Sequence, residues 1–177
     1  NGRGSELSAK TKTVKTMLGY LFTLADKYSP HRFTRKSLSS TFNYLPIGGQ
    51  LYTSGQPTEE QFASIKAAGF DAVIILAPHY TENSLRDEAA VMNQLAMDYV
   101  HIPVNFPKPS ERTFGLFIDA TAQSKNKKIW LHCAANMRVS AFLFRYRRGI
   151  LKEDATTAKL DLDKIWQPLG VWAHFIK

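Results

Sequence analysis

From residue 44 onward, short apolar runs alternate with longer amphipathic stretches. An apolar run of strand length that lacks polar alternation is typical of a strand buried on both faces of a sheet. Such runs occur at 71–77, 99–104 and 127–132, and two shorter segments at 44–47 and 50–53 flank a Gly-Gly turn. We therefore expect two short strands around the turn and buried strands after it.

The stretches between these runs carry apolar residues at helical spacing. Thr58 followed by Gln61 is the capping-box pattern that begins a helix, and Ser84, Ser110 and Asp154 are placed to cap later helices. The last strand should lead into a helix with an apolar inner face and a basic outer face. Its expected inward residues are Phe142, Leu143, Tyr146 and Ile150, and its expected outward residues are Arg145, Arg147 and Arg148.

Alternating strands and helices predict an α/β fold. We expect a parallel-dominated sheet of four or five strands, helices on both faces and right-handed crossovers. Ligands of such sheets bind beyond the carboxyl ends of the strands. The loops at those ends are 78–83, 105–110 and 133–138, so an active site should be assembled from them.

The N-terminal part reads differently. Residues 7–28 predict a helix with Leu21, Leu24 and Tyr28 on one side, and the polar run from Ser29 to Ser40 reads as a linker. We therefore divide the chain into an N-terminal helical extension with its linker, 1–40, and a core domain, 41–177.

Composition narrows the class of protein. The 177 residues are 44% hydrophobic and 21% charged, which is ordinary for a globular domain. No apolar run approaches the ~20 residues that cross a bilayer, so we expect no membrane span. No signal peptide is apparent, which favours a cytoplasmic protein, while the absence of an initiating Met leaves a periplasmic location open.

Charge and cysteine content point to the ligand. The net charge is +8, and the basic residues gather in 1–40 and 125–152. These zones suit phosphorylated or other small anionic substrates, and without a nucleic-acid motif we expect no sequence-specific nucleic-acid binding. Cys133 is the single cysteine, which excludes an intrachain disulfide and a cysteine-rich zinc site. The five histidines are scattered, so we expect no metal and no organic cofactor.

The most informative segment is 129–142. A predicted strand delivers Cys133 to a tight loop, and a helix begins just after it. Backbone N–H groups at a helix N-terminus create positive potential, which favours a thiolate and binds anions. Arg138 can hold an anion with its planar guanidinium, and Ser140 can donate a hydrogen bond to the sulfur. This layout predicts an anion-binding site with a cysteine nucleophile.

Three segments resemble the cysteine-dependent protein tyrosine and dual-specificity phosphatase superfamily: LYTSGQP at 51–57, YVHIPV at 99–104 and HCAANMRVSAF at 132–142. The resemblance covers roughly residues 43–150. More narrowly, the chain is similar to a bacterial phosphatase-like subgroup that also occurs fused to metallo-β-lactamase-type hydrolases. The resemblance implies a phosphocysteine mechanism at Cys133 and phosphate binding by the loop that follows it. The implied phosphate-binding residues are Ala134, Ala135, Asn136, Met137 and Arg138.

Two departures from the superfamily pattern leave alternatives open. Only four residues separate Cys133 from Arg138, where the phosphatases have five, and a four-residue gap is common in rhodanese-type sulfurtransferases. Asn105 stands where the phosphatases carry an aspartate, and an amide cannot protonate a leaving group. Glu111 is a candidate substitute, although a glutamate at a helix N-terminus is also a favourable charge there. The candidates are a phosphatase, a Cys133-persulfide sulfurtransferase and a non-catalytic anion-binding pseudophosphatase.

Several further residues are candidates for supporting roles. His132 can tune the nucleophile, and Asn136 can hold the loop backbone. Ser54 and Gln56 are expected to line the site through the resemblance, and His79 follows a strand at the predicted mouth. Each has a plain structural alternative as a buried strand-end or loop residue.

Overall fold

The computed structural model describes the backbone of residues 2–27 and 37–177 and the side chains of 10–25 and 37–177. Its centre is a five-stranded sheet in the order β1-β2-β5-β3-β4. β1 pairs with β2 in the antiparallel sense, and the other neighbours are parallel. The strands are β1 Leu45–Gly48, β2 Leu51–Ser54, β3 Ala72–Ile75, β4 Asp98–His101 and β5 Ile129–His132. The α/β fold predicted from the sequence is confirmed.

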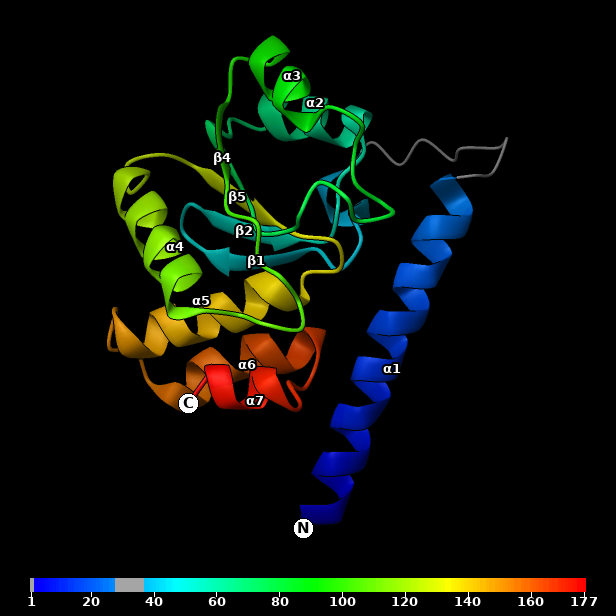
Figure 1. Cartoon of the computed structure of the whole chain (residues 1–177), viewed down its shortest axis with the longest axis vertical. Coiled ribbons are helices and arrows are strands. Elements are labelled where there is room, and N and C mark those ends of the chain that lie inside the picture. The colour runs from blue at the N-terminus through cyan, green and yellow to red at the C-terminus, as the bar shows by residue number, and fades with distance from the viewer. Residues whose placement is uncertain (1, 28–36) are drawn as a thin grey trace.

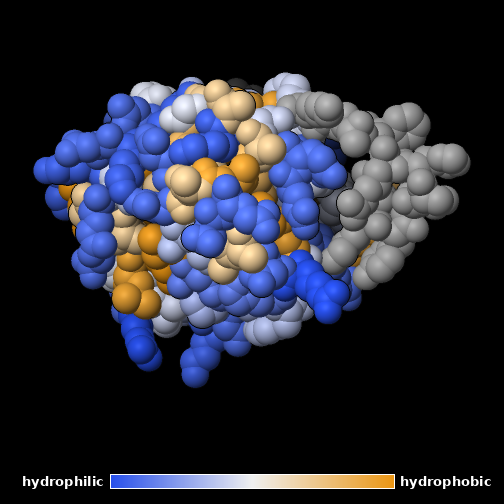
Figure 2. Space-filling model, turned by 90° about the horizontal axis from the view of Figure 1, so that it is seen from above, coloured by the Kyte–Doolittle hydropathy of each residue, from blue (hydrophilic) through white to orange (hydrophobic). Residues whose placement is uncertain are grey.

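Helices cover both faces of the sheet (Figure 1). α2 (Glu59–Ala67) and α3 (Glu88–Gln94) lie above it in that view. α4 (Glu111–Gln123), α5 (Met137–Gly149), α6 (Ala155–Ile165) and α7 (Val171–Phe175) lie on the opposite side. Viewed from the end that carries α2 and α3, the surface is mostly hydrophilic, with smaller hydrophobic groups between the polar side chains (Figure 2).

The sheet separates two hydrophobic clusters because successive side chains of a strand point to opposite faces. On the α2–α3 side, Val73 and Trp130 pack with Phe62, Phe70 and Met92. On the other side, strand residues such as Ile74 and Leu131 pack against α4, α5 and the C-terminal helices. A sheet buried on both faces explains why its central strands read as continuous apolar runs.

Three helix starts follow the predicted chemistry, and one does not. Thr58 and Gln61 form the expected capping box, and Ser110 and Asp154 cap α4 and α6. The cap of α3 is Asp87, not Ser84, whose hydroxyl instead donates to backbone oxygens of the preceding loop.

The stretch 99–104, expected to be a buried strand, differs from that expectation, because β4 is the edge strand of the sheet and ends at His101. The apolar residues Ile102 and Val104 therefore lie after the strand, and the residues of β4 itself are exposed or half-buried.

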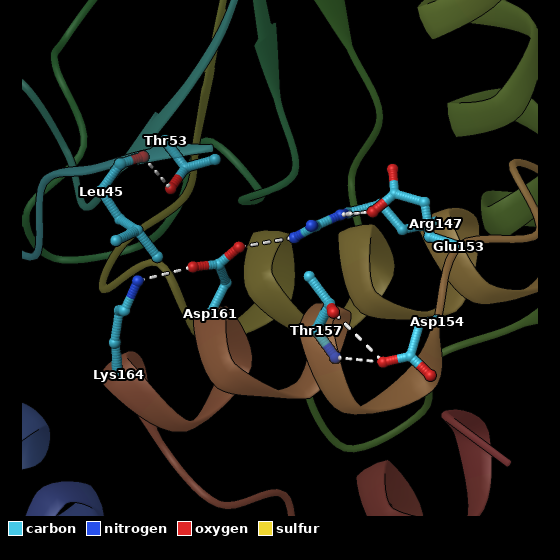
Figure 3. Close-up of polar contacts among 8 residues, drawn as sticks. All are labelled: Leu45, Thr53, Arg147, Glu153, Asp154, Thr157, Asp161 and Lys164. Carbon is cyan, nitrogen blue, oxygen red and sulfur yellow. Dashed lines mark hydrogen bonds and ion pairs between the residues drawn. The ribbon is translucent and has the colours of Figure 1, made fainter. Parts of the chain in front are cut away.

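The expected basic outer face of α5 is not a simple solvated surface. Arg147 is buried, and its guanidinium donates to Glu153 at 2.7 Å and to Asp161 at 2.6 Å (Figure 3). Lys164 pairs with the same Asp161, so the network ties α5 to α6 and to the turn between them. Two carboxylates satisfy the buried cation, and this offsets the cost of removing it from water.

The N-terminal helix α1 spans Gly2–Lys27 and stands beside the domain (Figure 1). It packs along α6, where the Thr16 hydroxyl donates to the Ile165 carbonyl at 2.5 Å. Of the apolar side expected from the sequence, Leu21 is exposed and Leu24 is half-buried. Tyr28 and the proposed linker up to residue 36 lie outside the described residues, and the domain division at residue 40 stays a prediction. In the described part, no helix combines the length and the apolar character needed to cross a membrane.

Candidate active site

The site is built on the connection between β5 and α5. β5 ends at His132, Cys133 follows as a fully buried residue, and α5 begins at Met137. Asn136 closes the loop with a left-handed backbone (φ 64°), a conformation that asparagine tolerates better than most residues. The first N–H groups of a helix have no intrahelical acceptor. Those of α5 therefore open onto the loop that carries the thiol.

Three hydrogen bonds hold the loop carbonyls on its outer side. The Ala134 carbonyl accepts from the Asn83 side-chain amide at 2.9 Å and from the Gln56 N–H at 3.3 Å. The Ala135 carbonyl accepts from the Asn43 side chain at 3.0 Å. In a trans peptide the C=O and the next N–H point in opposite directions. The N–H groups that follow these carbonyls therefore turn away from Asn83 and Asn43, as an anion cradle requires.

Asn136 secures the loop from inside the domain. Its side-chain amide donates to the Asn43 carbonyl at 2.8 Å and to the Thr53 hydroxyl at 2.9 Å. Thr53 in turn donates to the Leu45 carbonyl of β1 (Figure 3). These bonds agree with the loop-holding role expected for Asn136.

Arg138 lies on the first turn of α5 and is almost fully buried. Its Nε donates to the Val104 carbonyl at 2.9 Å, and the guanidinium carbon lies 5.1 Å from the centre of the Phe106 ring. Within the described part of the chain, Arg138 forms no salt bridge, so no carboxylate neutralises it. The arginine predicted to bind an anion is thus held next to the loop with its charge available.

The Ser140 hydroxyl has hydrogen-bond partners other than the sulfur. It donates to the Met137 carbonyl at 3.1 Å and accepts from the Trp166 indole N–H at 3.2 Å. Its single proton is therefore committed to the helix backbone and is not directed to the sulfur. Here Ser140 joins the start of α5 to the end of α6.

Behind Cys133 lies a buried polar cluster that the sequence did not reveal. His132 Nε2 lies 2.8 Å from the carboxylate of Glu88, and both side chains are excluded from solvent. The Gln56 amide donates to the other oxygen of Glu88 at 2.7 Å. Burial by itself raises the pKa of Glu88, but the His132 charge and the hydrogen bonds from His132 and Gln56 outweigh it and leave that pKa below its usual value. The cluster anchors the side chain of the residue before Cys133.

The other supporting candidates lie in separate surroundings. Ser54 is fully buried, donates to the Gly55 carbonyl and accepts from the Trp130 indole, so its role is structural. His79 packs against His101, with ring centres 3.8 Å apart. Burial is the main cause that lowers the pKa of His101, whose ring bonds to the Ala77 carbonyl. Asn105 is exposed, in the turn after β4.

Glu111 is engaged elsewhere. Both of its carboxylate oxygens accept hydrogen bonds from Arg145 at 2.8 Å, and this pairing lowers the pKa of Glu111. The Arg145 guanidinium is also held over the rings of Phe114 and Phe175. A carboxylate that stays ionised in a bidentate pair is a poor proton donor. This pairing makes Glu111 a poor candidate for the general acid.

α1 brings Tyr20 to the neighbourhood of the site. Burial raises the pKa of the Tyr20 phenol, and the charges of Glu82, Arg138 and Cys133 also act on it. The helix is held there because Gly19 packs directly against the Phe42 ring, which also lies against Gly55 next to the loop. The helical extension is thus a neighbour of the site and not a remote appendage.

Four site neighbours carried no clear sequence signal: Tyr20, Asn43, Asn83 and Glu88. A glutamate in the first turn of a helix ordinarily faces solvent, and loop asparagines usually serve turns. The signal that could have helped was the predicted edge of the sheet, since residues 78–88 follow a strand whose carboxyl end meets the Cys133 loop. In the described part of the chain, no three His, Cys, Asp or Glu side chains gather as a metal site.

Comparison with known proteins places the chain. A family described as DSP-PTPase phosphatase fused to NAD+ kinase matches residues 46–167. The crystal structure of a DUF442 protein from Shewanella putrefaciens CN-32, named as a candidate phosphatase, is 31% identical. The alignment covers 78% of this chain and 91% of that chain, with a TM-score of 0.70. Among curated protein sequences, none matches the chain significantly.

More distant structures share the fold. The core catalytic domain of the PP-IP phosphatase SIW14 from S. cerevisiae is 13% identical with a TM-score of 0.65, over 79% of this chain and 86% of that chain. A cysteine-to-serine variant of TpbA from P. aeruginosa, solved in complex with pTyr, is 16% identical with a TM-score of 0.56, over 68% and 72% of the two chains. The architecture that carries the loop is therefore shared with these proteins.

Proposed function

The chain belongs to the family described as DSP-PTPase phosphatase fused to NAD+ kinase, and from this membership we propose that it hydrolyses phosphate monoesters with Cys133 as the nucleophile. The observation that carries the proposal is the orientation of the 133–136 loop. The Ala134 and Ala135 carbonyls are bonded outward by Asn83, Gln56 and Asn43, so the N–H groups that follow them turn the other way, beside the N-terminus of α5. Such a cradle suits a phosphate dianion.

The reaction has two steps. In the first, the Cys133 thiolate attacks phosphorus, the P–S bond forms, and the bond to the ester oxygen breaks with its electron pair on the leaving group. In the second, a water molecule attacks phosphorus, the P–S bond breaks, and inorganic phosphate and the thiolate are released. The loop N–H groups and Arg138 stabilise the charge on the three non-bridging oxygens in both steps.

Arg138 is suited to this role because its position is fixed before the ligand arrives. The bond from Nε to the Val104 carbonyl and the contact with Phe106 limit its rotamers, so less side-chain entropy is lost on binding. Arg138→Lys should weaken phosphate binding, because a point charge does not reproduce the planar guanidinium.

The leaving group decides which esters are good substrates. Asn105 cannot donate a proton, and Glu111 is paired with Arg145, so neither supplies the usual general acid. Aryl oxyanions depart without full protonation, whereas alkoxides do not. We therefore expect aryl phosphates to be cleaved much faster than alkyl phosphates.

The test is steady-state hydrolysis of an aryl and an alkyl phosphate by the wild type, Cys133→Ser and Asn105→Asp. We expect no turnover by Cys133→Ser. Asn105→Asp should gain part of the alkyl rate, by at most ~10²–10⁴, which is the usual contribution of a positioned acid. Cleavage of both esters by Cys133→Ser at the wild-type rate would refute the cysteine mechanism.

A parallel assay with thiosulfate separates the competing chemistry. Turnover of thiosulfate, with neither ester cleaved, would show that the four-residue spacing serves a persulfide at Cys133. Binding of inorganic phosphate without turnover of any donor would indicate an anion-binding module. Either result overturns the phosphatase proposal.

A further inference from the structure

The apolar face of α1 points to solvent and away from the domain. Five apolar side chains lie on one face of the helix at positions i, i+3, i+4, i+7 and i+8, and each is between 51% and 73% exposed. We call this set the outer stripe of α1: Val14, Met17, Leu18, Leu21 and Phe22. A helix that belonged only to this domain would bury such a face against the core.

The face toward the domain is made of polar and small residues. Thr13 accepts from the Gln167 N–H at 3.0 Å, Thr16 donates to the Ile165 carbonyl, and Gly19 packs on Phe42. Asn43 links this face to the site, because its amide reaches both Thr16 and the Ala135 carbonyl. These directional contacts determine which way the helix faces, so the exposure of the outer stripe is a property of the docked helix.

The charges beside the outer stripe indicate what covers it. By helical geometry Lys10 continues the stripe at its N-terminal end and Lys15 lies at one edge of it; Lys12 is also exposed, and residues 10–25 contain no acidic residue. An apolar face bordered by lysines is the pattern of helices that lie in the headgroup region of an anionic bilayer. A second copy packed on the same face would bring lysines together without an acidic partner from this stretch.

We propose that the outer stripe of α1 docks the protein on anionic lipid surfaces, with the helix lying in the plane of the membrane. The opposite face of α1 carries Thr16, which Asn43 links to the Ala135 carbonyl of the Cys133 loop. Docking therefore places the loop about one helix diameter, ~10–12 Å, above the headgroups. This proposal concerns attachment and is independent of the chemistry at Cys133.

The experiment is co-sedimentation of the full chain with vesicles of phosphatidylcholine alone and of phosphatidylcholine with phosphatidylglycerol. We expect binding to the anionic vesicles, weak binding to the neutral ones and a decrease with added salt. Leu18→Glu with Leu21→Glu should weaken binding by more than about tenfold. Lys10→Gln with Lys15→Gln should weaken it by roughly 25-fold, about fivefold for each lysine near the surface.

The matched control is Leu160→Glu with Leu169→Glu, which makes the same chemical change at exposed leucines outside α1. This pair and Cys133→Ser should bind as the wild type does. Equal binding to neutral and anionic vesicles, or no binding to either, would overturn the proposal. So would an equal loss in the control pair. A dimer in solution that the Leu18/Leu21 variant abolishes would assign the stripe to a second copy instead.

Discussion

Removing the Glu88 carboxylate tests the buried cluster behind Cys133. Glu88 is 2% exposed and accepts from His132 at 2.8 Å and from Gln56 at 2.7 Å. Glu88→Ala leaves one N–H of His132 and one N–H of Gln56 without an acceptor, while the other Gln56 N–H keeps the Pro57 carbonyl at 3.2 Å. At ~1–3 kcal/mol for each unpaired buried group, the variant should lose about 4 kcal/mol of unfolding free energy.

Glu88→Gln is the matched control for size. Its amide oxygen can still accept from His132, and the Gln56 side-chain oxygen, which has no hydrogen-bond partner in the described part, can turn to accept from the new amide. We expect this variant to lose only ~1–2 kcal/mol. The measurement is urea unfolding at neutral pH. A loss below about 1 kcal/mol for Glu88→Ala would refute the reasoning, because it would mean that the two donors find other partners.

The stability that this cluster contributes should decrease in acid. The folded-state pKa of Glu88 lies below its ordinary value of 4.5. The ionised carboxylate therefore contributes its full stability above that value, and the contribution is lost as the pH falls through the folded-state pKa. The stability difference between wild type and Glu88→Gln should be constant at neutral pH and should shrink below about pH 4.5. A difference that grows with acidity would contradict the assigned direction.

Two further changes test the loop support and the α5–α6 network. A Cβ on Gly55 would lie 3.0 Å from the Ala134 carbonyl and 2.8 Å from the Phe42 ring, so Gly55→Ala should cost ~1–3 kcal/mol and impair phosphate binding. Gly115→Ala, where nothing lies within 4 Å, is its control and should be neutral or stabilising in thermal unfolding. Arg147→Ala removes two short bonds to carboxylates from a buried cation and should cost ~2–3 kcal/mol in urea unfolding. Lys159→Ala, which breaks an exposed pair, should change stability by less than ~0.5 kcal/mol, and equal effects of these two variants would refute a special role for the buried network.

The fold was predictable because its signals are local. Strands buried on both faces must be apolar throughout. The apolar runs at 71–77 and 127–132 meet this requirement whichever helices pack on the sheet. Capping is equally local: Thr58 and Gln61 are three residues apart and satisfy each other. The Cys133 loop follows from the same kind of signal, since a strand, a turn and a helix come in immediate succession.

The order of the strands in the sheet and the burial of individual polar side chains could be read only from the tertiary structure. Nothing in 99–104 distinguishes an edge strand from a central one, because position in a sheet depends on pairing with residues far along the chain. Arg147 has the spacing of a solvent-facing residue, and it is buried because Glu153 and Asp161 come from outside α5. A charge becomes compatible with the interior only when distant partners converge on it.

One part of the candidate site could be predicted from the sequence, and another part became visible only in the structure. Cys133, Arg138 and the loop amides could be proposed from the sequence alone, since the proposed nucleophile and its proposed anion cradle lie within one short segment. Only the structure identified Glu88, Asn83 and Tyr20, which come from other elements and carry no signature of their own. Tertiary contacts likewise determine which face of α1 packs on the domain. Thr13 and Thr16 form hydrogen bonds to the domain, so the outer stripe on the other face of the helix points to solvent.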